Sequence, residues 1–438
     1  MSSEWRLLTL KEAGVSLIDC DHKTPPASEE GYPYIAIPQL KNGHISLEGV
    51  RRISHVDYLE WTKKLKPQAN DVIVVRRCNS GDSAHVPAGL DCAIGQNLVV
   101  LRASGERVRP DFLRWLLKGP EWWAQVSKFI NVGAVFDSLR CRDIPNFELM
   151  IPPLVEQAEI ARVLGAIDNR ITLLRETNAT LEAIAQALFK SWFVDFDPVH
   201  AKAEGRQPEG MDAPTAALFP DSFEESELGL VPKGWAVKPV GDAVDCLGGG
   251  TPDTKEASYW EPAEHCWTTP KDLSGLQSPV LLRTERQLST LGLAKVSSGL
   301  LPAGTLLLSS RAPIGYLAIA QMPVAVNQGY IAIPSGGVLS PVYMLFWCRQ
   351  NMEGIKGRAN GSTFMEISKK AFRPIPALVP TADVLDAFAN IAEPLFERLI
   401  ENERQAQTLT QLRDTLLPRL ISGQLRLPEA ESLLEKAL

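Results

Sequence analysis

Residues 160–192 read IARVLGAIDNRITLLRETNATLEAIAQALFKSW, and the spacing of their apolar side chains decides the fold. Positions 160, 164, 167, 171, 174, 178, 181, 185, 188 and 192 advance alternately by four and three residues, and all of them except Asn178 are apolar. This spacing is typical of a coiled-coil seam. It predicts one helix of roughly 35 residues, which is about 50 Å long at 1.5 Å per residue.

The same pattern recurs later in the chain. Pro152 and Pro380 are 228 positions apart, and this offset continues without a gap to Phe193 and Ile421. The equivalent seam positions are Phe388, Ala392, Leu395, Leu399, Asn402, Ala406, Leu409, Arg413, Leu416 and Leu420. Similarity that arises by chance would not keep the same offset between matching positions over this length. The constant offset therefore indicates an internal duplication.

The region before each helix is also repeated. Thr24-Pro25 is matched by Thr251-Pro252, and Gln96 before one apolar run is matched by Gln328 before another. Short β-branched runs separated by Gly and Pro predict an irregular sheet with one helical stretch. The fold expected is therefore α+β, with two pseudo-symmetric globules separated by a pair of long antiparallel coiled-coil helices. The expected segments are a first globule (1–152), a first helix (153–195), a linker (196–230), a second globule (231–380), a second helix (381–423) and a C-terminal tail (424–438).

Two asparagines interrupt the apolar seams. If the helices are paired antiparallel about their centres, Asn178 and Asn402 face each other. A buried polar pair of this kind can fix the register of a coiled coil. The alternative is that each asparagine is a tolerated polar position with access to solvent.

Composition excludes several classes of protein. The chain has 438 residues, of which 45% are hydrophobic and 22% are charged, which are ordinary values for a globular protein of two or three domains. No apolar run is long enough to span a bilayer, and no secretory signal is visible at the start, so we expect a cytoplasmic protein without a membrane partner. Seven scattered cysteines without a C-x-x-C pair argue against a disulfide framework or a zinc ribbon.

The net charge of −7 is distributed unevenly along the chain. Residues 1–150 carry a net charge of +1 and residues 229–380 a net charge of +4, whereas the remaining segments together carry −12. Contacts to phosphate depend on local positive potential, so this distribution permits DNA binding by the two globules. Solvated helices rich in Glu explain the same distribution equally well.

The helix with its flanks, PPLVEQAEIARVLGAIDNRITLLRETNATLEAIAQALFKSWFVDFDPV (152–199), resembles a known family. The proline-bearing entry, Glu156-Gln157 and the run from Ser191 to Phe196 are similar to the central conserved region of the specificity subunits of type I restriction–modification systems. The ending DTLLPRLISGQL of the second copy resembles their distal conserved region. The second helix departs from the first, because Val379-Pro380-Thr381-Ala382-Asp383 lacks the Glu-Gln pair.

The resemblance implies a function for each part of the chain. The globules are expected to be target recognition domains, each of which binds one half of an asymmetric bipartite sequence in double-stranded DNA. The helices are expected to dock two methylation subunits, with Glu156, Gln157, Trp192 and Phe193 as candidate docking residues. S-adenosylmethionine is then expected on these subunits, and ATP and Mg on two restriction subunits, so that this chain binds no cofactor itself and directs adenine methylation and cleavage.

Motifs for catalysis are missing from the sequence. Gly248-Gly249-Gly250-Thr251-Pro252 has no lysine where a phosphate-binding loop requires one, and no H-E-x-x-H occurs. A nuclease site could be assembled only from Pro220-Asp221 and Asp253-Thr254-Lys255, which straddle the linker and the second globule. We therefore expect no enzyme activity and no metal site. The alternative function is a coiled-coil adaptor that holds two protein partners without sequence-specific DNA binding.

Base recognition requires Arg or Lys for guanine and Asn or Gln for adenine, whereas phosphates also accept hydrogen bonds from Ser and Thr. Polar side chains of these types cluster where apolar runs end. Each of them also has a structural alternative, as a turn residue or a solvated charge. The candidates are Arg76, Arg77, Asn79, Ser80, Gln96, Asn97 and Asn131 in the first globule, and Lys271, Ser309, Ser310, Arg311, Asn327, Gln328, Asn360, Ser362 and Thr363 in the second.

Overall fold

The computed structural model describes residues 5–21, 23–133, 136–311, 313–361, 365–426 and 428–430. Its chain forms two compact units. Unit 1 comprises residues 1–171 and 408–438, and unit 2 comprises residues 172–407. The two long helices, α4 (Leu154–Phe193) and α13 (Ala382–Ile421), contribute residues to both units.

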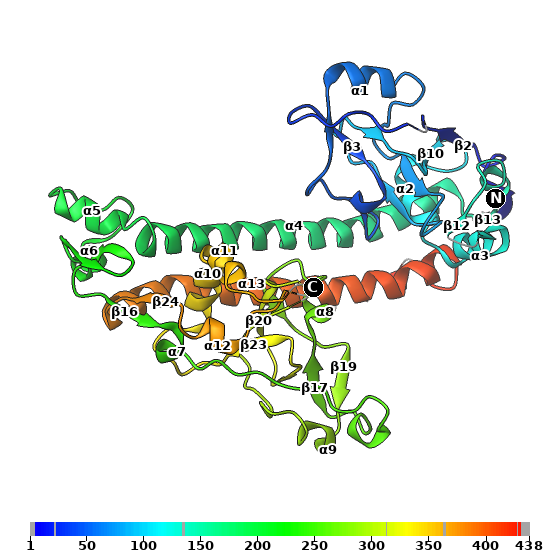
Figure 1. The fold of residues 1–438 in the computed structure, drawn as a ribbon. Coiled ribbons are helices and arrows are strands. Elements are labelled where there is room, and N and C mark those ends of the chain that lie inside the picture. The colour runs from blue at the N-terminus through cyan, green and yellow to red at the C-terminus, as the bar shows by residue number, and fades with distance from the viewer. Residues whose placement is uncertain are drawn as a thin grey trace. The chain divides into compact units, whose positions relative to one another are not determined.

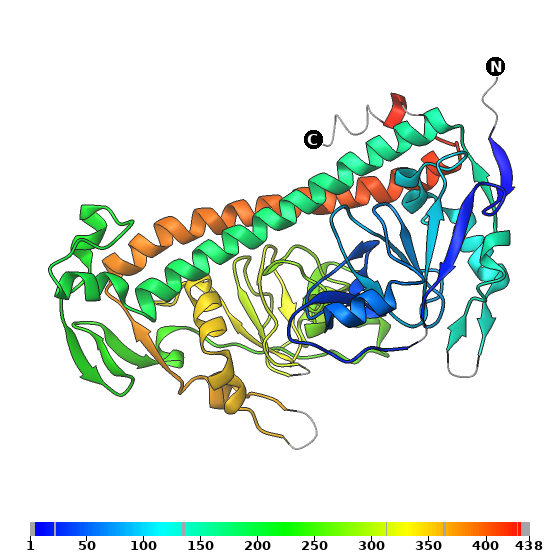
Figure 2. The ribbon, with the colours of Figure 1, turned by 90° about the horizontal axis from the view of Figure 1, so that it is seen from above.

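Each long helix contains 40 residues. In each unit the segments of α4 and α13 lie side by side and run in opposite directions (Figures 1 and 2). Seam residues such as Ile167, Leu399 and Leu416 are at most 2% exposed, because the four-three spacing directs them into the contact between the helices. The predicted α+β class with a pair of long helices is therefore confirmed.

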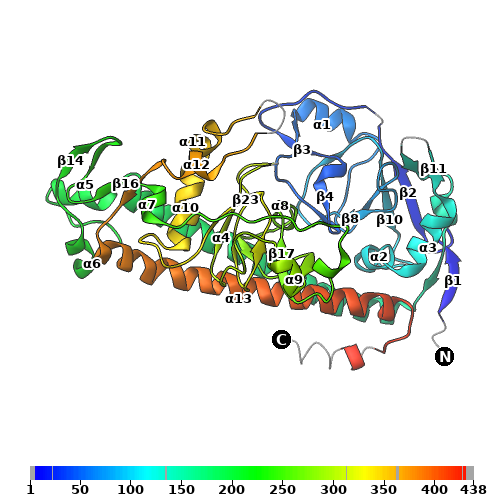
Figure 3. The same cartoon turned by 60° about the horizontal axis from the view of Figure 1, so that its bottom comes forward.

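Unit 1 is built around a four-stranded sheet in the order β2-β10-β7-β8, with helix α2 packed beside β8 and β10 (Figure 3). A second sheet has the order β6-β3-β9, and β1 pairs with β13 next to the start of α4. Short pairs β4-β5 and β11-β12 complete the unit. The strands are β1 (Arg6–Thr9), β2 (Val15–Asp19), β3 (Tyr32–Ile35), β4 (Leu40–Lys41), β5 (His44–Ile45), β6 (Arg52–Ile53), β7 (Val72–Val75), β8 (Ser83–His85), β9 (Ala93–Ile94), β10 (Leu98–Ala103), β11 (Asn131–Val132), β12 (Asp137–Ser138) and β13 (Glu148–Ile151).

Unit 2 contains a four-stranded sheet in the order β18-β21-β20-β23 and a three-stranded sheet in the order β19-β17-β22. Strands β16 and β24 pair before α13, and β14 and β15 form a hairpin that begins in the predicted linker (196–230) and ends at Pro232. The strands are β14 (Phe223–Ser226), β15 (Gly229–Pro232), β16 (Ala236–Pro239), β17 (His265–Thr268), β18 (Val280–Leu281), β19 (Arg286–Leu288), β20 (Leu306–Ser309), β21 (Leu317–Ala320), β22 (Ala325–Val326), β23 (Tyr330–Ile333) and β24 (Pro376–Val379).

The two units share one strand topology. In unit 1, β7 pairs antiparallel with β10 and β8, and in unit 2, β20 pairs antiparallel with β23 and β21. Strand β3 has one antiparallel and one parallel neighbour, as does β17. The sheets differ in their fourth strand, because β2 extends the first beside β10 whereas β18 extends the second beside β21. The duplication inferred from the sequence is therefore visible in the pairing of the strands.

Shorter helices connect these strands. Unit 1 contains α1 (His55–Trp61), α2 (Pro110–Leu116), α3 (Pro120–Phe129) and the 3₁₀ helices η1 (Ile37–Gln39) and η2 (Ile144–Asn146). Unit 2 contains α5 (Asp197–Ala203), α6 (Ala213–Leu218), α7 (Val240–Ala243), η3 (Ala257–Tyr259), α8 (Pro270–Leu273), α9 (Thr290–Leu293), α10 (Pro341–Gln350), α11 (Met352–Gly357) and α12 (Lys369–Phe372). A proline or a Ser or Thr cap begins most of them, as the preferences of helix N-termini predict.

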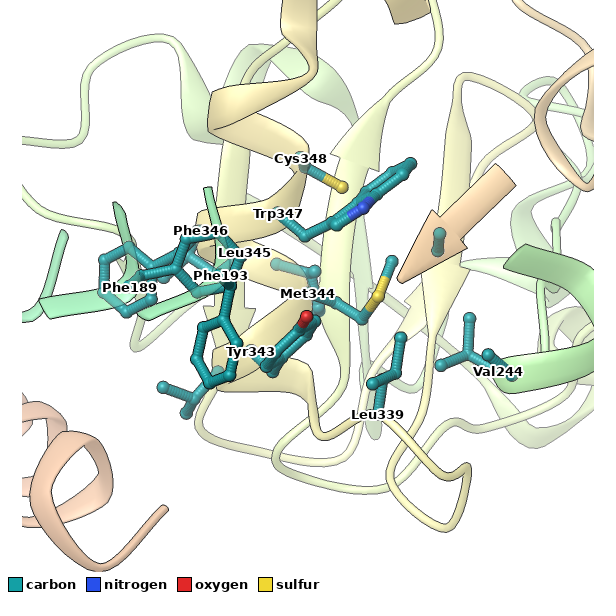
Figure 4. Packing of buried hydrophobic residues seen from close by; sticks show 14 of the residues in the cluster. Phe189, Phe193, Val244, Leu339, Tyr343, Met344, Leu345, Phe346, Trp347 and Cys348 are labelled. Atoms are coloured by element: carbon teal, nitrogen blue, oxygen red, sulfur yellow. The ribbon is translucent and has the colours of Figure 1, made fainter. Parts of the chain in front are cut away.

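The core of unit 2 joins the long helices to the four-stranded sheet of this unit. Phe189 and Phe193 of α4 pack against α10, whose residues Tyr343 to Cys348 are all buried (Figure 4). The Phe193 and Tyr343 rings are 5.1 Å apart, in an edge-to-face arrangement that aromatic pairs prefer. The second half of α4 is therefore part of the same hydrophobic core as the sheet of unit 2.

Candidate nucleic-acid interface

In unit 1, two predicted polar loops meet at one end of the four-stranded sheet. The loop after β7 begins at Arg76, whose backbone N–H donates to the carbonyl of Asn97 at 2.9 Å. Asn79 and Asn97 have φ angles of 72° and 68°, which asparagine tolerates better than most residues. The side chains of Arg77, Asn79 and Gln96 are exposed, and those of Arg76 and Asn97 are partly exposed. These five candidates lie on one edge and are accessible to a ligand.

Ser80, in contrast, is not accessible. Its side chain is buried, and its hydroxyl donates to Asp137 Oδ1 at 2.9 Å. The hydroxyl fastens its loop to β12, which favours a structural role for Ser80, and its contact with DNA stays a prediction. Asn131 is partly buried, and its Nδ2 donates to the carbonyl of Ser138 at 3.4 Å, which links β11 to β12.

In unit 2, the equivalent loops meet in the same way. The backbone N–H of Ser310 donates to the carbonyl of Gly329 at 2.8 Å. Gln328 is exposed, whereas Asn327 is partly buried and its Oδ1 accepts from the N–H of Gly329 at 2.8 Å. Arg311 is partly exposed, with its Nη1 3.8 Å from Glu366 Oε2. Gln328 and Arg311 are therefore accessible at this edge, as is in part Asn327, whose amide oxygen already holds a turn.

Both serines of this edge are buried, which favours a structural role over the predicted contact with DNA. Ser309 is 0% exposed, and its hydroxyl donates to the carbonyl of Pro313 and accepts from the N–H groups of Gly315 and Tyr316. Ser310 is 2% exposed. The Ser309 hydroxyl holds this turn together, because it bonds backbone groups on the other side of the turn.

The remaining candidates lie elsewhere in unit 2. Lys271 is exposed, and its Nζ donates to Glu285 Oε2 at 2.8 Å, which raises the pKa of the ammonium group. Asn360 is paired through its backbone with Glu366. Ser362 and Thr363 lie outside the described residues. The glycine run that resembles a phosphate-binding loop has a packing role, because a Cβ on Gly249 would lie 1.7 Å from the carbonyl oxygen of Val326.

The two seam asparagines lie together in unit 2. Asn402 Nδ2 donates to Asn178 Oδ1 at 2.9 Å, and Asn178 Nδ2 donates to the carbonyl of Leu399 at 3.2 Å. Both side chains are buried, at 2% and 1% exposed. Because slipping the helices would separate the amides within an apolar seam, the pair disfavours alternative registers.

Three of the four candidate docking residues are buried, which favours a structural role for these side chains, and docking by them stays a prediction. Gln157 is 0% exposed, and its amide joins the start of α4 to the start of α2 by accepting from the N–H of Arg109 and donating to the carbonyl of Arg107. Trp192 and Phe193 belong to the core of unit 2. Glu156 is partly exposed, and its Oε2 accepts from Trp5 Nε1 at 2.8 Å.

A buried ionic cluster in unit 1 was missed by sequence reasoning. Asp168 of α4 is 2% exposed and contacts Arg413 of α13 at 2.8 Å, Arg114 of α2 at 3.2 Å and His44 of β5 at 3.2 Å. Burial alone raises the pKa of the Asp168 carboxyl, but the hydrogen bond with His44 and the charges of Arg114 and Lys118 outweigh it and hold the pKa below its usual range. The available signal was Arg413, because an arginine at a seam position requires an acidic partner.

His85 of β8 lies beside this cluster. Its Nδ1 is 3.2 Å from the carbonyl oxygen of Gly43, and its Nε2 is 3.0 Å from Arg114 Nη1. Burial and the Arg114 charge lower the pKa of His85 from 6.5 to about 4. The neutral ring therefore donates through Nδ1 and accepts from Arg114 through Nε2.

The low pKa of His85 predicts acid sensitivity. Between pH 6.5 and about 4 the His85 ring is protonated in the unfolded chain but neutral in the folded chain. The free energy of unfolding therefore falls as the pH falls. The slope from this group approaches ~1.4 kcal/mol per pH unit. Urea titrations across this range are expected to show a flatter slope for His85→Gln, which keeps a donor and an acceptor but does not titrate. An unchanged slope would assign the acid sensitivity to another group, whereas the Asp168 contribution is lost only below about pH 4.

Among the described residues, no group of three or more His, Cys, Asp and Glu side chains is arranged to hold a metal ion. Within the same ranges, no helix has the length and apolar character needed to cross a bilayer. The predicted DNA-binding candidates that are accessible at the two sheet edges are Arg, Asn and Gln side chains, which hydrogen-bond bases and phosphates.

Comparison with known proteins identifies the family. The model of the type I restriction modification DNA specificity domain matches residues 9–183 and again residues 232–410. The type I restriction enzyme HindI specificity subunit of Haemophilus influenzae is 26% identical over 425 residues, covering 85% of this chain and 90% of the relative. The MjaIX specificity subunit of Methanocaldococcus jannaschii is 37% identical over 185 residues, covering 42% of each chain.

A solved structure shares the fold. The S subunit of a type I restriction–modification system from M. genitalium superposes with a TM-score of 0.55 at 17% identity, and the alignment covers 96% of each chain. The two matches to the family model fall on the two copies of the duplication and together include most of the chain. This protein therefore belongs to the type I restriction modification DNA specificity family, and its role is to determine DNA sequence specificity.

Proposed function

We propose that this chain is the DNA recognition subunit of a type I restriction–modification complex, in which each of its two recognition regions reads one half of an asymmetric bipartite target. The observation that carries this proposal is that one strand topology occurs twice and presents different polar side chains at the same edge. At the loop after the central strand, unit 1 exposes Arg77 and Asn79 where unit 2 presents Arg311. Different side chains in equivalent places are suited to reading different bases.

The proposal assigns the chemistry to partners. Two methylation subunits would carry S-adenosylmethionine and dock on the helical part of the chain, and two restriction subunits would supply the steps that need ATP and Mg. The docking surface would use exposed side chains of α4 and α13, and Leu173 and Ile184 are examples on α4. The buried Trp192 and Phe193 would not take part. The adaptor alternative is not favoured by the match to a DNA specificity family.

The test is a methylome. The chain is co-expressed with a methylation subunit of its own system in a host without modification, and methylated adenines are mapped by single-molecule sequencing. We expect one motif with two unequal halves separated by a fixed gap. Exchanging residues 231–380 for the same region of a relative with another target should change one half of the motif and leave the other intact. A complex that co-purifies but methylates no defined motif would contradict the proposal.

A further inference from the structure

A threonine and a glutamine are hydrogen-bonded at the exposed edge of unit 1. Gln96 Nε2 donates to Thr24 Oγ1 at 3.0 Å, and both side chains are exposed. The carbonyl of Lys23, directly before this threonine, accepts from the hydroxyl of the buried Tyr34 at 3.1 Å. Tyr34 lies on β3 and is paired with Ala93 of β9, three residues before Gln96. The strands β3 and β9 thus hold both partners of the bond in place.

Unit 2 contains the same arrangement. Thr251 Oγ1 donates to Gln328 Oε1 at 2.6 Å, and both side chains are exposed. The carbonyl of Gly250, directly before this threonine, accepts from Nε1 of the buried Trp267 at 3.1 Å. Trp267 lies on β17 and is paired with Ala325 of β22, again three residues before the glutamine.

The two threonine–glutamine pairs therefore occupy equivalent positions in units 1 and 2 and are held by the same kinds of hydrogen bond. In both units a buried aromatic donor holds the carbonyl that precedes a Thr-Pro step, and that threonine binds a glutamine from the loop after a parallel strand. The aromatic residue differs, as Tyr34 is replaced by Trp267, but the bond that it donates is kept. Both threonine–glutamine pairs lie on the surface, where their free donor groups are open to a ligand.

The two units are proposed to read different base sequences, yet both contain a threonine–glutamine pair. A pair that is the same in both units is suited to contact a part of the DNA that is the same in both half-sites. The common part of two DNA half-sites is the sugar–phosphate backbone, to which half or more of protein–DNA hydrogen bonds are made. We propose that the pairs Thr24–Gln96 and Thr251–Gln328 bind the DNA backbone, one in each half-site, and do not select bases. This inference rests on the proposed function and adds residues with a defined role to it.

The chemistry of the pair fits an acceptor ligand such as phosphate. A glutamine amide has two N–H donors and a threonine hydroxyl has one, and the internal bond uses one of these three. Because the threonine hydroxyl can donate or accept, the amide keeps at least one N–H outside the bond in either orientation. The threonine acts as a positioning residue, since it restricts the rotamers of a long side chain before DNA arrives.

The experiment uses the full chain in complex with its methylation subunit. Binding is measured by fluorescence anisotropy on two DNA duplexes. One contains the motif identified by mapping methylated adenines, and the other has an unrelated sequence. Gln96→Ala and Gln328→Ala are each expected to weaken binding to both duplexes by the same factor, roughly tenfold for a hydrogen bond to a charged acceptor. Gln96→Glu, which places a carboxylate against the phosphates, should weaken both further. The methylated motif should remain unchanged in every case.

Matched variants separate this role from a structural one. Gln68→Glu makes the same charge change at an exposed position before β7, at the opposite end of that strand, and is expected to leave both affinities intact. Thr24→Ser keeps the hydroxyl and should bind like the unaltered chain, whereas Thr24→Val should bind like Gln96→Ala. Since no charge is removed, the slope of log K against log salt should not change with Gln96→Ala.

The outcomes are distinguishable. A motif that changes in the half read by unit 1 when Gln96 is replaced would make the pair a base reader and overturn the inference. Unchanged affinity with a lowered melting temperature would make the pair a structural bond, which also overturns it. If the unaltered complex shows no preference between the two duplexes, the proposed function itself fails. If it shows the preference and the variants bind equally well, only the inference fails.

Discussion

Replacing Asp168 with alanine is expected to lower the free energy of unfolding by about 3–5 kcal/mol, the usual result of removing one partner from a buried ionic cluster. The carboxylate is 2% exposed and contacts two arginines that are each 13% exposed. Without it, Arg114 and Arg413 would face each other in a place where water cannot replace the lost charge. The cost therefore comes from the two cations that stay buried and not only from the hydrogen bonds that disappear.

The measurement is urea unfolding at neutral pH, with Asp414→Ala as the matched control. Asp414 binds the same Arg413 guanidinium, with 2.8 Å between Nη2 and Oδ1, but it is 61% exposed. An exposed ion pair contributes about 0–1 kcal/mol, so this control should stay close to the unaltered chain. Equal effects of the two substitutions would show that water reaches the cluster and would contradict its buried character.

This cluster also shows where prediction from the sequence ends. The spacing of Ile and Leu predicted both long helices, because a seam with a period of 3.5 residues has one efficient way to bury its side chains. The same seam placed Asn178 opposite Asn402. Asp168 lies one position beside seam residue 167 and finds its partners on three separate elements, so no local pattern marks it. The sequence shows the cationic partner, Arg413, at a seam position, but it does not show which acidic residue contacts it.

The candidate interface was predictable to a similar extent. Strand ends and turn residues predicted which loops carry polar groups, and Arg77, Asn79, Gln96 and Gln328 are exposed as a binding role requires. The burial of the serines in the same loops was not predictable, because serine suits a surface contact or a buried turn equally well and only the fold decides between them. The bond between Gln96 and Thr24 joins residues 72 positions apart, and the repeat of both residues was its only trace in the sequence.

Replacing Trp192 with alanine is expected to destabilise the chain by about 3–5 kcal/mol, the cost of removing a large aromatic side chain from a packed core. Trp192 is 4% exposed, and its ring lies 5.0 Å from that of Phe219 and 6.2 Å from that of Phe388. These two neighbours come from the segment after α6 and from α13, so the cavity would weaken the contact of α4 with both. Thermal and urea unfolding of the full chain measure the effect.

The matched control is Ile184→Ala on the same helix. Ile184 is 50% exposed, and its truncation is expected to change the free energy of unfolding by about 0.5 kcal/mol or less. The two substitutions are expected to differ in their effect on binding of the methylation subunit. The exposed Ile184 offers apolar surface to a partner, whereas Trp192 can contact a partner only if the core opens. Loss of the complex with unchanged stability for Trp192→Ala would therefore support the predicted docking role of Trp192. Loss of stability for Trp192→Ala, with a weaker complex for Ile184→Ala, would assign docking to the outer face of α4.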